Sequence, residues 1–160
     1  MSRTTVVAID GDAAQRLAVG VWEAARRATG NPPTDARVRR VHDKVRGGAV
    51  GLLAHRGDRA AGMLVAEPYR ADGTSDATCG HLSMVFVDPA LWGVGIGGAM
   101  VRALQRGDHG PGWIRLSVWT RTTNTRAQRL YVARGFTDTG ERSTLREGDV
   151  IGRWEWCAEA

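Results

Sequence analysis

The sequence is poor in the features that mark several other classes of protein. Its two cysteines, Cys79 and Cys157, lie far apart and form no CxxC pair, so neither a disulfide framework nor a zinc site is indicated. The first residues, MSRTTVVAIDGD, contain no long apolar segment, and no apolar run approaches the length that spans a membrane. We therefore expect a cytoplasmic protein with no membrane partner and no bound metal.

Lysine is almost absent, because Lys44 is the only one, and arginine carries nearly all of the positive charge. The net charge of +5 gives a mild positive field, which would help to attract a polyanionic ligand. The arginines are scattered and are not interleaved with aromatic residues, so a nucleic-acid partner is not indicated. A chain of 160 residues is long enough to bury a core, and we expect a single domain over residues 1–160.

The stretch from Val85 to Met100, VFVDPALWGVGIGGAM, carries the clearest local signal. It predicts a strand that ends at Pro89, then a turn rich in glycine, then a helix whose apolar residues follow helical spacing. The glycines are at 93, 95, 97 and 98. Glycine lets backbone amides approach a phosphate, and the start of a helix favours negative charge. A pyrophosphate-like ligand is predicted here; a glycine-rich turn without a ligand is the alternative. The spacing fits neither a Rossmann fingerprint nor a P-loop.

Two motifs in this sequence resemble those of the GCN5-related N-acetyltransferase (GNAT) superfamily. The first is V-x-P followed by Gln/Arg-x-x-Gly-x-Gly/Ala, which reads here Val87-Asp88-Pro89 and then Trp92 to Gly97. The second is N-x-x-A-x-x-L-Y-x-x-x-G-F, which reads Asn124 to Phe136. Together they cover roughly residues 80–137. Trp92 departs from the pattern, since Gln or Arg is usual there, and Val94 is apolar where relatives are often basic.

The resemblance implies an enzyme that moves an acetyl group from acetyl-CoA to a primary amine of a small molecule or a protein. The implied fold is α/β (α+β): a mixed, twisted central sheet of six to seven strands with helices on both faces. The helix pair over residues 13–46 would form one wall of the acceptor site. The alternative is a non-catalytic acetyl-CoA-binding module that regulates a partner. The acceptor is left open among an antibiotic amine, a polyamine, an amino acid and a protein N-terminus.

The resemblance also implies a set of site residues. The unpaired amides of Val85 and Val87 would face the thioester oxygen and the pantetheine amide, and Tyr131 would be the general acid. Asn124 would hold the pantetheine arm or simply cap a helix, and Tyr131 could instead be a core aromatic. The residues expected to bind the cofactor are Val85, Phe86, Val87, Trp92, Gly93, Val94, Gly95, Ile96, Gly97, Gly98 and Asn124.

The general base is less clearly marked, although most of an alkyl amine is charged at neutral pH and must lose a proton. His81 is the first candidate, because we expect it to share the alternation of Ser83, Val85 and Val87 along the central strand. Glu67 and water are the rivals. Trp22, on the first helix, is the tryptophan expected to contact the acceptor.

The apolar pattern predicts the element order β-α-α-β-β-β-α-β-α-β-β. The first helix should bury Leu17, Val21, Ala24 and Ala28, and residues 68–78 should form a loop. Residues 113–119 should run parallel to residues 80–87. The last strand, residues 150–156, is apolar on both alternations, so we expect it to be an exposed edge that a second subunit covers in a homodimer.

Overall fold

The central feature of the fold is a seven-stranded sheet with strand order β1-β2-β3-β4-β5-β7-β6, seen in a computed structural model that describes residues 3–159. Neighbouring strands are antiparallel except β4 and β5, which are parallel as predicted. The elements are β1 (Thr4–Ala8), α1 (Gly11–Ala28), α2 (Asp35–Gly47), β2 (Val50–Arg56), β3 (Arg59–Ala71), β4 (Thr74–Val87), the 3-10 turn η1 (Pro89–Leu91), α3 (Ile96–Gln105), β5 (Arg115–Arg121), α4 (Thr125–Ala133), β6 (Thr137–Thr144) and β7 (Val150–Cys157). The predicted element order and the mixed sheet are confirmed.

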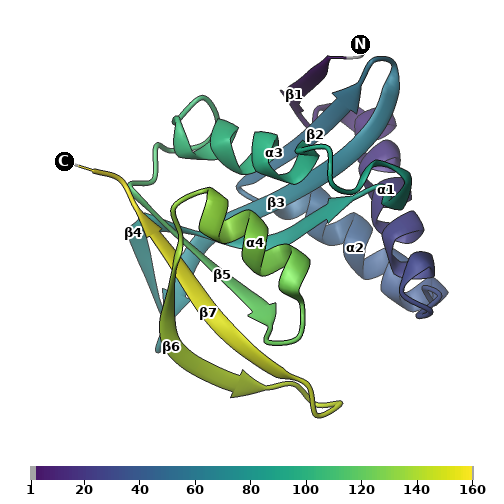
Figure 1. Cartoon of the computed structure of the whole chain (residues 1–160). Coiled ribbons are helices and arrows are strands. Elements are labelled where there is room, and N and C mark those ends of the chain that lie inside the picture. Colours follow the sequence, from purple (N-terminus) through teal and green to yellow (C-terminus); the bar gives the residue numbers. More distant parts are fainter. Residues whose placement is uncertain (1–2, 160) are drawn as a thin grey trace.

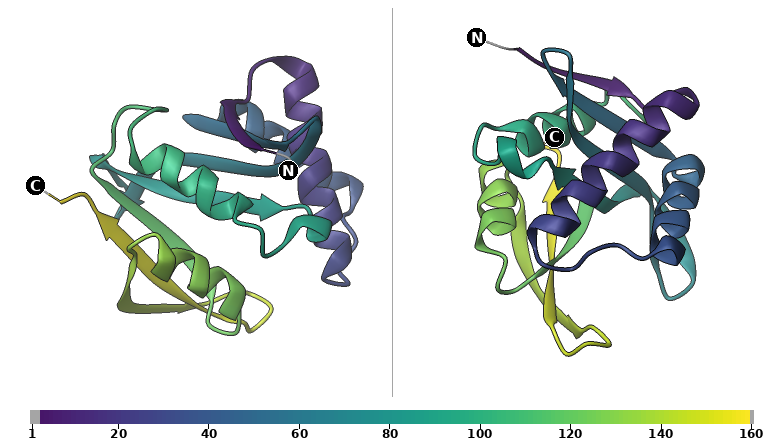
Figure 2. Two further views of the ribbon diagram at one scale, coloured as in Figure 1. Left: turned by 45° about the horizontal axis from the view of Figure 1, so that its top comes forward. Right: turned by 90° about the vertical axis from the view of Figure 1, so that its right-hand side faces the viewer.

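Helices cover both faces of the sheet, α1 and α2 on one and α3 and α4 on the other (Figures 1 and 2). Each face has its own apolar core. The core under α3 and α4 includes Leu64, Leu82, Ile96, Met100 and Leu116, and the core under α1 and α2 includes Val19, Trp22, Leu53, Met63 and Met84. Within residues 3–159, no helix is long and apolar enough to cross a membrane.

The buried face of α1 differs from the predicted one. Leu17 is 47% exposed, whereas Ala18, Val21, Trp22 and Ala25 are buried. This set follows the i, i+3, i+4, i+7 spacing of a helix that lies flat on a sheet. Trp22 is only 3% exposed and belongs to the core, so the expectation that it contacts the acceptor is wrong.

The predicted loop over residues 68–78 is a β-hairpin instead. Strand β3 continues to Ala71 and β4 already begins at Thr74, so that only Asp72 and Gly73 form the turn. Both turn residues have positive φ, 53° at Asp72 and 76° at Gly73, as the two-residue turns that match the twist of a hairpin require. This segment is polar because most residues at the end of β3 and the start of β4 are exposed to solvent.

The last strand is not an edge. β7 lies between β5 and β6 and pairs with both in antiparallel fashion. The edge on this side of the sheet is β6, whose eight residues are all exposed and polar or glycine, a composition that discourages further strand pairing. β7 therefore has a strand on either side, although Val150 at its start is 42% exposed, and the argument that this strand is an edge covered by a second subunit was wrong.

Candidate functional site

Strands β4 and β5 separate along their length and leave part of β4 without a neighbour on that side. Their parallel pairing is limited to Cys79–Leu82 and Arg115–Val118. The amide of Asp88 donates to the carbonyl oxygen of Ala61 on the β3 side at 2.8 Å. Amides point alternately to either side along a strand, so those of Val85 and Val87 point toward the gap that β5 has left.

A β-bulge at Ser83 changes which face the following residues occupy. Val65 pairs with Met84 but Ala66 pairs with Leu82, which leaves Ser83 as the extra residue. Leu82 and Val85 consequently both pack toward α3, while Met84 packs toward α1. His81, which precedes Leu82, lies on the α1 and α2 face, so the expectation that it shares one alternation with Val85 and Val87 is wrong.

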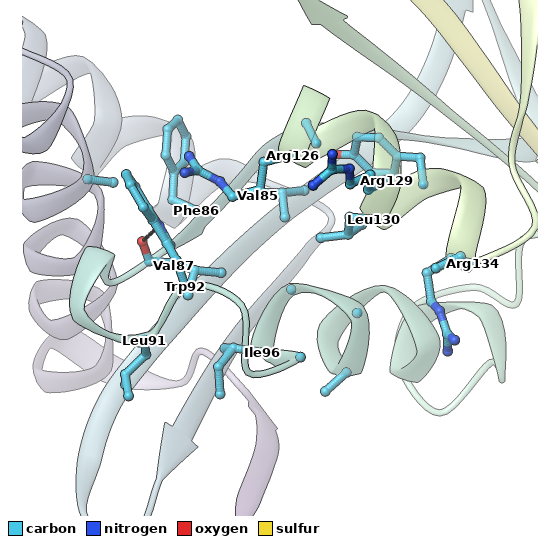
Figure 3. A pocket seen from close by; sticks show the side chains of 18 of the residues that line it. Val85, Phe86, Val87, Leu91, Trp92, Ile96, Arg126, Arg129, Leu130 and Arg134 are labelled. Atoms are coloured by element: carbon cyan, nitrogen blue, oxygen red, sulfur yellow. Dashed lines mark hydrogen bonds between the residues drawn. The ribbon is translucent and has the colours of Figure 1, made fainter. Parts of the chain in front are cut away.

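A cavity of about 1320 Å³ runs along this gap and between α3 and α4 (Figure 3). Its wall includes nearly all residues that the sequence marked for cofactor binding: Val85, Phe86, Val87, Trp92, Gly93, Gly95, Ile96, Gly97, Gly98 and Asn124. Tyr131 also lines it. Val94 does not line the cavity and is 47% exposed. Neither His81 nor Glu67 is part of this wall.

The glycine turn is open where a phosphate would need to approach. Gly93 and Gly95 have φ of 82° and 86°, and a Cβ at either position would meet no atom within 4 Å. Gly95 is the N-cap of α3 and supplies no side-chain cap, which leaves the first amides of α3 available to a ligand. Gly97 has a different role, because its Cβ would lie 2.4 Å from Cδ1 of Leu130. It allows α3 to pack closely against α4.

Trp92, the departure from the family pattern, closes over the end of β4. Its indole Nε1 donates to the carbonyl oxygen of Val87 at 3.0 Å. The guanidinium of Arg126, from the first turn of α4, lies 3.5 Å from the centroid of the Trp92 ring. Sequence reasoning missed Arg126, because an arginine on an amphipathic helix usually faces solvent. The signal that could have revealed it was its place inside the second motif.

Arginine dominates the charge of the cavity wall. Seven arginines and two aspartates line it: Arg26, Arg102, Arg106, Arg121, Arg126, Arg129, Arg134, Asp108 and Asp149. This excess of positive charge suits a ligand with several phosphates. These arginines belong to the helices, the residues just after them and the end of β5. The cavity is therefore positively charged even though the glycine turn itself carries no basic side chain.

Two residues of the second motif are held in defined environments. Asn124 is the N-cap of α4, because its Oδ1 accepts from the amide of Ala127 at 3.1 Å. Tyr131 is 5% exposed, and its ring centroid lies 5.3 Å from that of Phe136. Burial raises the pKa of the Tyr131 phenol above its ordinary value of 10, so the phenol keeps its proton.

The two candidate bases differ in their surroundings. Burial lowers the pKa of His81 below its ordinary value of 6.5, and the charge of Glu67 opposes this shift only in part. The pKa of Glu67 is also lowered, first by a hydrogen bond that the Ser83 hydroxyl donates and further by Lys44, whose Nζ lies 3.2 Å from Oε1. At neutral pH, His81 is therefore neutral and can accept a proton, whereas Glu67 is a stabilised carboxylate with weak basicity.

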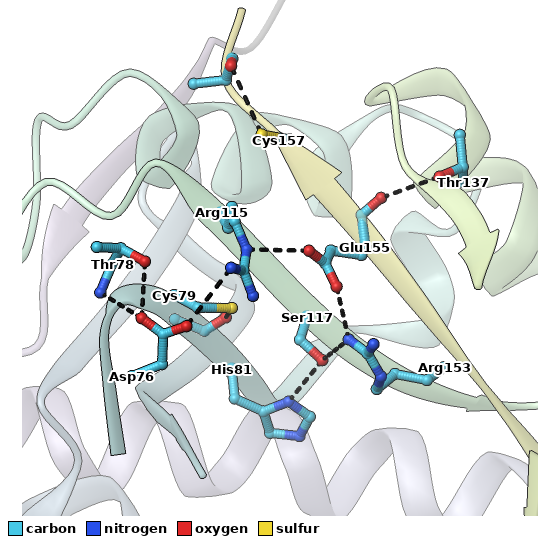
Figure 4. Close-up of polar contacts among 12 residues, drawn as sticks. Asp76, Thr78, Cys79, His81, Arg115, Ser117, Thr137, Arg153, Glu155 and Cys157 are labelled. Carbon is cyan, nitrogen blue, oxygen red and sulfur yellow. Dashed lines mark hydrogen bonds and ion pairs between the residues drawn. The ribbon is translucent and has the colours of Figure 1, made fainter. Parts of the chain in front are cut away.

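His81 belongs to a polar cluster on the α1 and α2 face of the sheet (Figure 4). Sequence reasoning did not find this cluster. Its Nδ1 is 3.3 Å from the hydroxyl of Ser117, which is fully buried. Nη1 of Arg153 donates to the same hydroxyl at 3.2 Å and to Glu155 at 2.9 Å. The ring centroids of Tyr69 and His81 are 5.7 Å apart. The cluster fixes one side of the imidazole ring.

The splayed strand pair, the glycine turn at a helix start and the arginine-rich wall together form a cavity suited to a ligand with several phosphates. Residues 18–136 match the profile of the acetyltransferase (GNAT) family, and the chain belongs to this family. It is therefore an N-acetyltransferase by family, and acetyl-CoA is the acetyl donor that this family uses. Among curated proteins, the comparison found no match.

Solved structures show the same fold at low sequence identity. The ribosomal-protein-S18-alanine N-acetyltransferase from Escherichia coli has a TM-score of 0.73 at 15% identity, over 99% of this chain and 96% of that one. A GNAT-family acetyltransferase from Bacillus cereus has a TM-score of 0.75 at 16% identity, over 99% of both chains. A chain of the NatC complex, determined with Gag peptide and CoA, has a TM-score of 0.66 at 14% identity, over 96% of this chain and 99% of that one.

Proposed function

We propose that this protein transfers the acetyl group of acetyl-CoA to a primary amine by direct attack of the amine on the thioester. The observation that carries the proposal is the cavity itself, which brings together the free amide of Val85, the phenol of Tyr131 and the open glycine turn. When bound, acetyl-CoA supplies the activated acetyl group and a thiol leaving group.

The residues present fit this cosubstrate. The turn is open at Gly93 and Gly95, and the first amides of α3 have no side-chain cap, so a pyrophosphate can approach there. The cation that the turn lacks at positions 92 and 94 is supplied by Arg126. Trp92 serves as the platform that holds the Arg126 guanidinium at the mouth of the cavity. Asn124 and the amide of Val87 flank the path of the pantetheine arm.

The amide of Val85 is the group best placed to stabilise negative charge on the thioester oxygen. It is part of a strand and points into the gap, so it requires no reorganisation when charge develops. Tyr131, neutral because it is buried, donates its proton to the departing sulfur as the C–S bond breaks. The new bond joins the amine nitrogen to the acetyl carbon.

His81 is the proposed base and receives, through water, the proton that the amine must lose, because His81 does not line the cavity. The bulge places His81 on the opposite face of β4 from Val85, so acid and base lie on different sides of the sheet. Glu67 is the weaker candidate, since its hydrogen bond with Ser83 and its ion pair with Lys44 stabilise the charged form.

Release of free thiol from acetyl-CoA tests the proposal across small amines, amino acids and peptides, with Tyr131→Phe as the matched variant. We expect rapid release with at least one amine class and a strong loss in the variant. Acetyl-CoA should also raise the melting temperature more than ATP or NAD does. Binding without transfer to any amine would favour a regulatory module, and no response to acetyl-CoA would overturn the proposal.

A further inference from the structure

The cavity extends past the glycine turn to the α1 side of β4. Phe86 packs on the α1 side of β4, yet it lines the same cavity as Val85 and Val87, which face α3. From there the wall is formed by the C-terminal end of α1, with Ala25, Arg26, Thr29 and Asn31. The glycine turn and α4 form the opposite walls. If acetyl-CoA occupies the α3 and α4 side, the α1 side is left to the acceptor.

Arg26 is the charged residue on the α1 wall, and its guanidinium has no hydrogen-bond or ion-pair partner among residues 3–159. Its Nε is shielded from solvent and has no hydrogen-bond partner within residues 3–159. Among residues 3–159, neither Arg26 nor Arg37 forms an ion pair. By contrast, Nη2 of Arg27, the residue after Arg26, lies 3.8 Å from Oε2 of Glu23. A polar group left without a partner is costly when it is buried, and an anionic ligand removes that cost.

Other arginines reinforce the positive charge at this end of the cavity. Arg121, at the end of β5, lines the same cavity as Arg26. Burial lowers the pKa of Arg26, and the charges of Arg37 and Arg121 lower it further, whereas the charge of Glu147 raises it. Glu147 and Asp149 are the nearby acids, and both are engaged by Arg121, at 3.4 and 2.9 Å. The positive charge of Arg26 and Arg37 is not neutralised in this way.

We propose that the amine acceptor carries a carboxylate, as an amino acid does, and that Arg26 binds this carboxylate. The inference rests on the proposed N-acetyltransferase function and narrows its acceptor. A planar guanidinium fits a carboxylate through two parallel hydrogen bonds. Polyamines and aminoglycoside-like polycations are disfavoured, because they would bring further positive charge to Arg26 and Arg37, which have no ion-pair partner among residues 3–159. The other possible source of an anion for Arg26 is a phosphate of CoA, and the experiment separates the two.

The test compares each amino acid with its carboxamide, which has the same size but no negative charge. In wild type, we expect kcat/KM to favour the amino acid by about 10- to 150-fold, the range of a hydrogen bond to a charged group. The carboxamide has the less basic amine, so chemical reactivity alone would favour it. In Arg26→Gln, the preference should disappear through a higher KM for the amino acid, with little change for the carboxamide. Arg27→Gln, on the exposed side of α1, is the matched control and should keep the preference.

Three results would overturn the inference. They are an equal or better rate with carboxamides in wild type, an equal effect of Arg26→Gln on both members of a pair, and an equal loss in Arg27→Gln. Calorimetry with acetyl-CoA provides the separate arm: a comparable loss of cofactor affinity in Arg26→Gln would assign the guanidinium to a CoA phosphate and refute the inference. If no amine is acetylated, the proposed function fails by itself. Calorimetric binding of amino acid against carboxamide to the CoA complex then decides the role of Arg26.

Discussion

Replacing Arg126 by alanine tests how this cavity holds a phosphorylated cofactor without a cation in its glycine turn. The guanidinium lies 3.5 Å from the Trp92 ring centroid. An exposed cation–π contact contributes about 0.5–1 kcal/mol, which the variant loses with and without ligand alike. The larger expected effect is on binding, because a hydrogen bond to a charged group is worth about 1.5–3 kcal/mol. At about 1.4 kcal/mol per tenfold change, Kd for CoA should rise by about 10- to 150-fold.

Isothermal titration calorimetry with two ligands isolates the contribution of the phosphates. Affinity for CoA should fall in Arg126→Ala, whereas affinity for S-acetylpantetheine, which lacks the pyrophosphate, should stay unchanged. The dependence of CoA binding on salt should also become shallower, because one charged contact has been removed. Arg126 is exposed, so the melting temperature of the free protein should change little.

Arg129→Ala is the matched control, because Arg129 lies on the same helix and lines the same cavity. It is not stacked on an aromatic ring among the described residues. If both variants lose the same affinity, the cavity attracts CoA through its general positive field and not through a positioned Arg126. An equal loss for S-acetylpantetheine would likewise refute the assignment to the pyrophosphate.

Three further predictions concern the chemistry and the glycine turn. Tyr131→Phe should lower kcat by about 10²–10⁴-fold in steady-state assays and leave the Kd for acetyl-CoA unchanged; full activity would exclude the phenol as the acid. Because the pKa of His81 is lowered, its base form persists below pH 6.5, so the acid limb of kcat/KM should lie below that value and disappear in His81→Ala; an unchanged pH–rate profile would point to Glu67 or water. Gly95→Asp should abolish CoA binding at a moderate cost in stability, because its Cβ meets open space but a φ of 86° strains a residue with a side chain. Gly97→Asp should lower the melting temperature further through its clash with Leu130; retained CoA binding in Gly95→Asp would place the cradle elsewhere.

The parts of the site that were predictable depend on local chemistry. A glycine turn between a strand and a helix is specified by residues that are close in sequence, and its open backbone at Gly93 and Gly95 follows from the absence of side chains. The N-cap at Asn124 is equally local, because its carboxamide reaches an amide only three residues ahead. The parallel pairing of β4 and β5 follows from the crossover helix between them.

The parts that were missed depend on contacts between distant segments. One extra residue at Ser83 moves His81 to the opposite face from Val85, and the alternation of the sequence does not reveal where that residue is inserted. The predicted element order includes both final strands, but it does not indicate which of them pairs with β5, so the place of β7 inside the sheet was missed. Arg126 and Trp92 meet only because α4 packs beside the glycine turn, so neither sequence position alone indicated their contact.

The presence of a single lysine, Lys44, has a practical consequence for coupling this protein to a dye or a support. Lys44 is the only lysine of the sequence, and it lies on α2 beside Glu67, on the sheet face that carries His81. Reagents directed at side-chain amines will therefore attach on the side where the proposed base lies. Cys157, exposed at the end of β7, offers a thiol handle instead, and Cys79 is buried and protected from the same reagent.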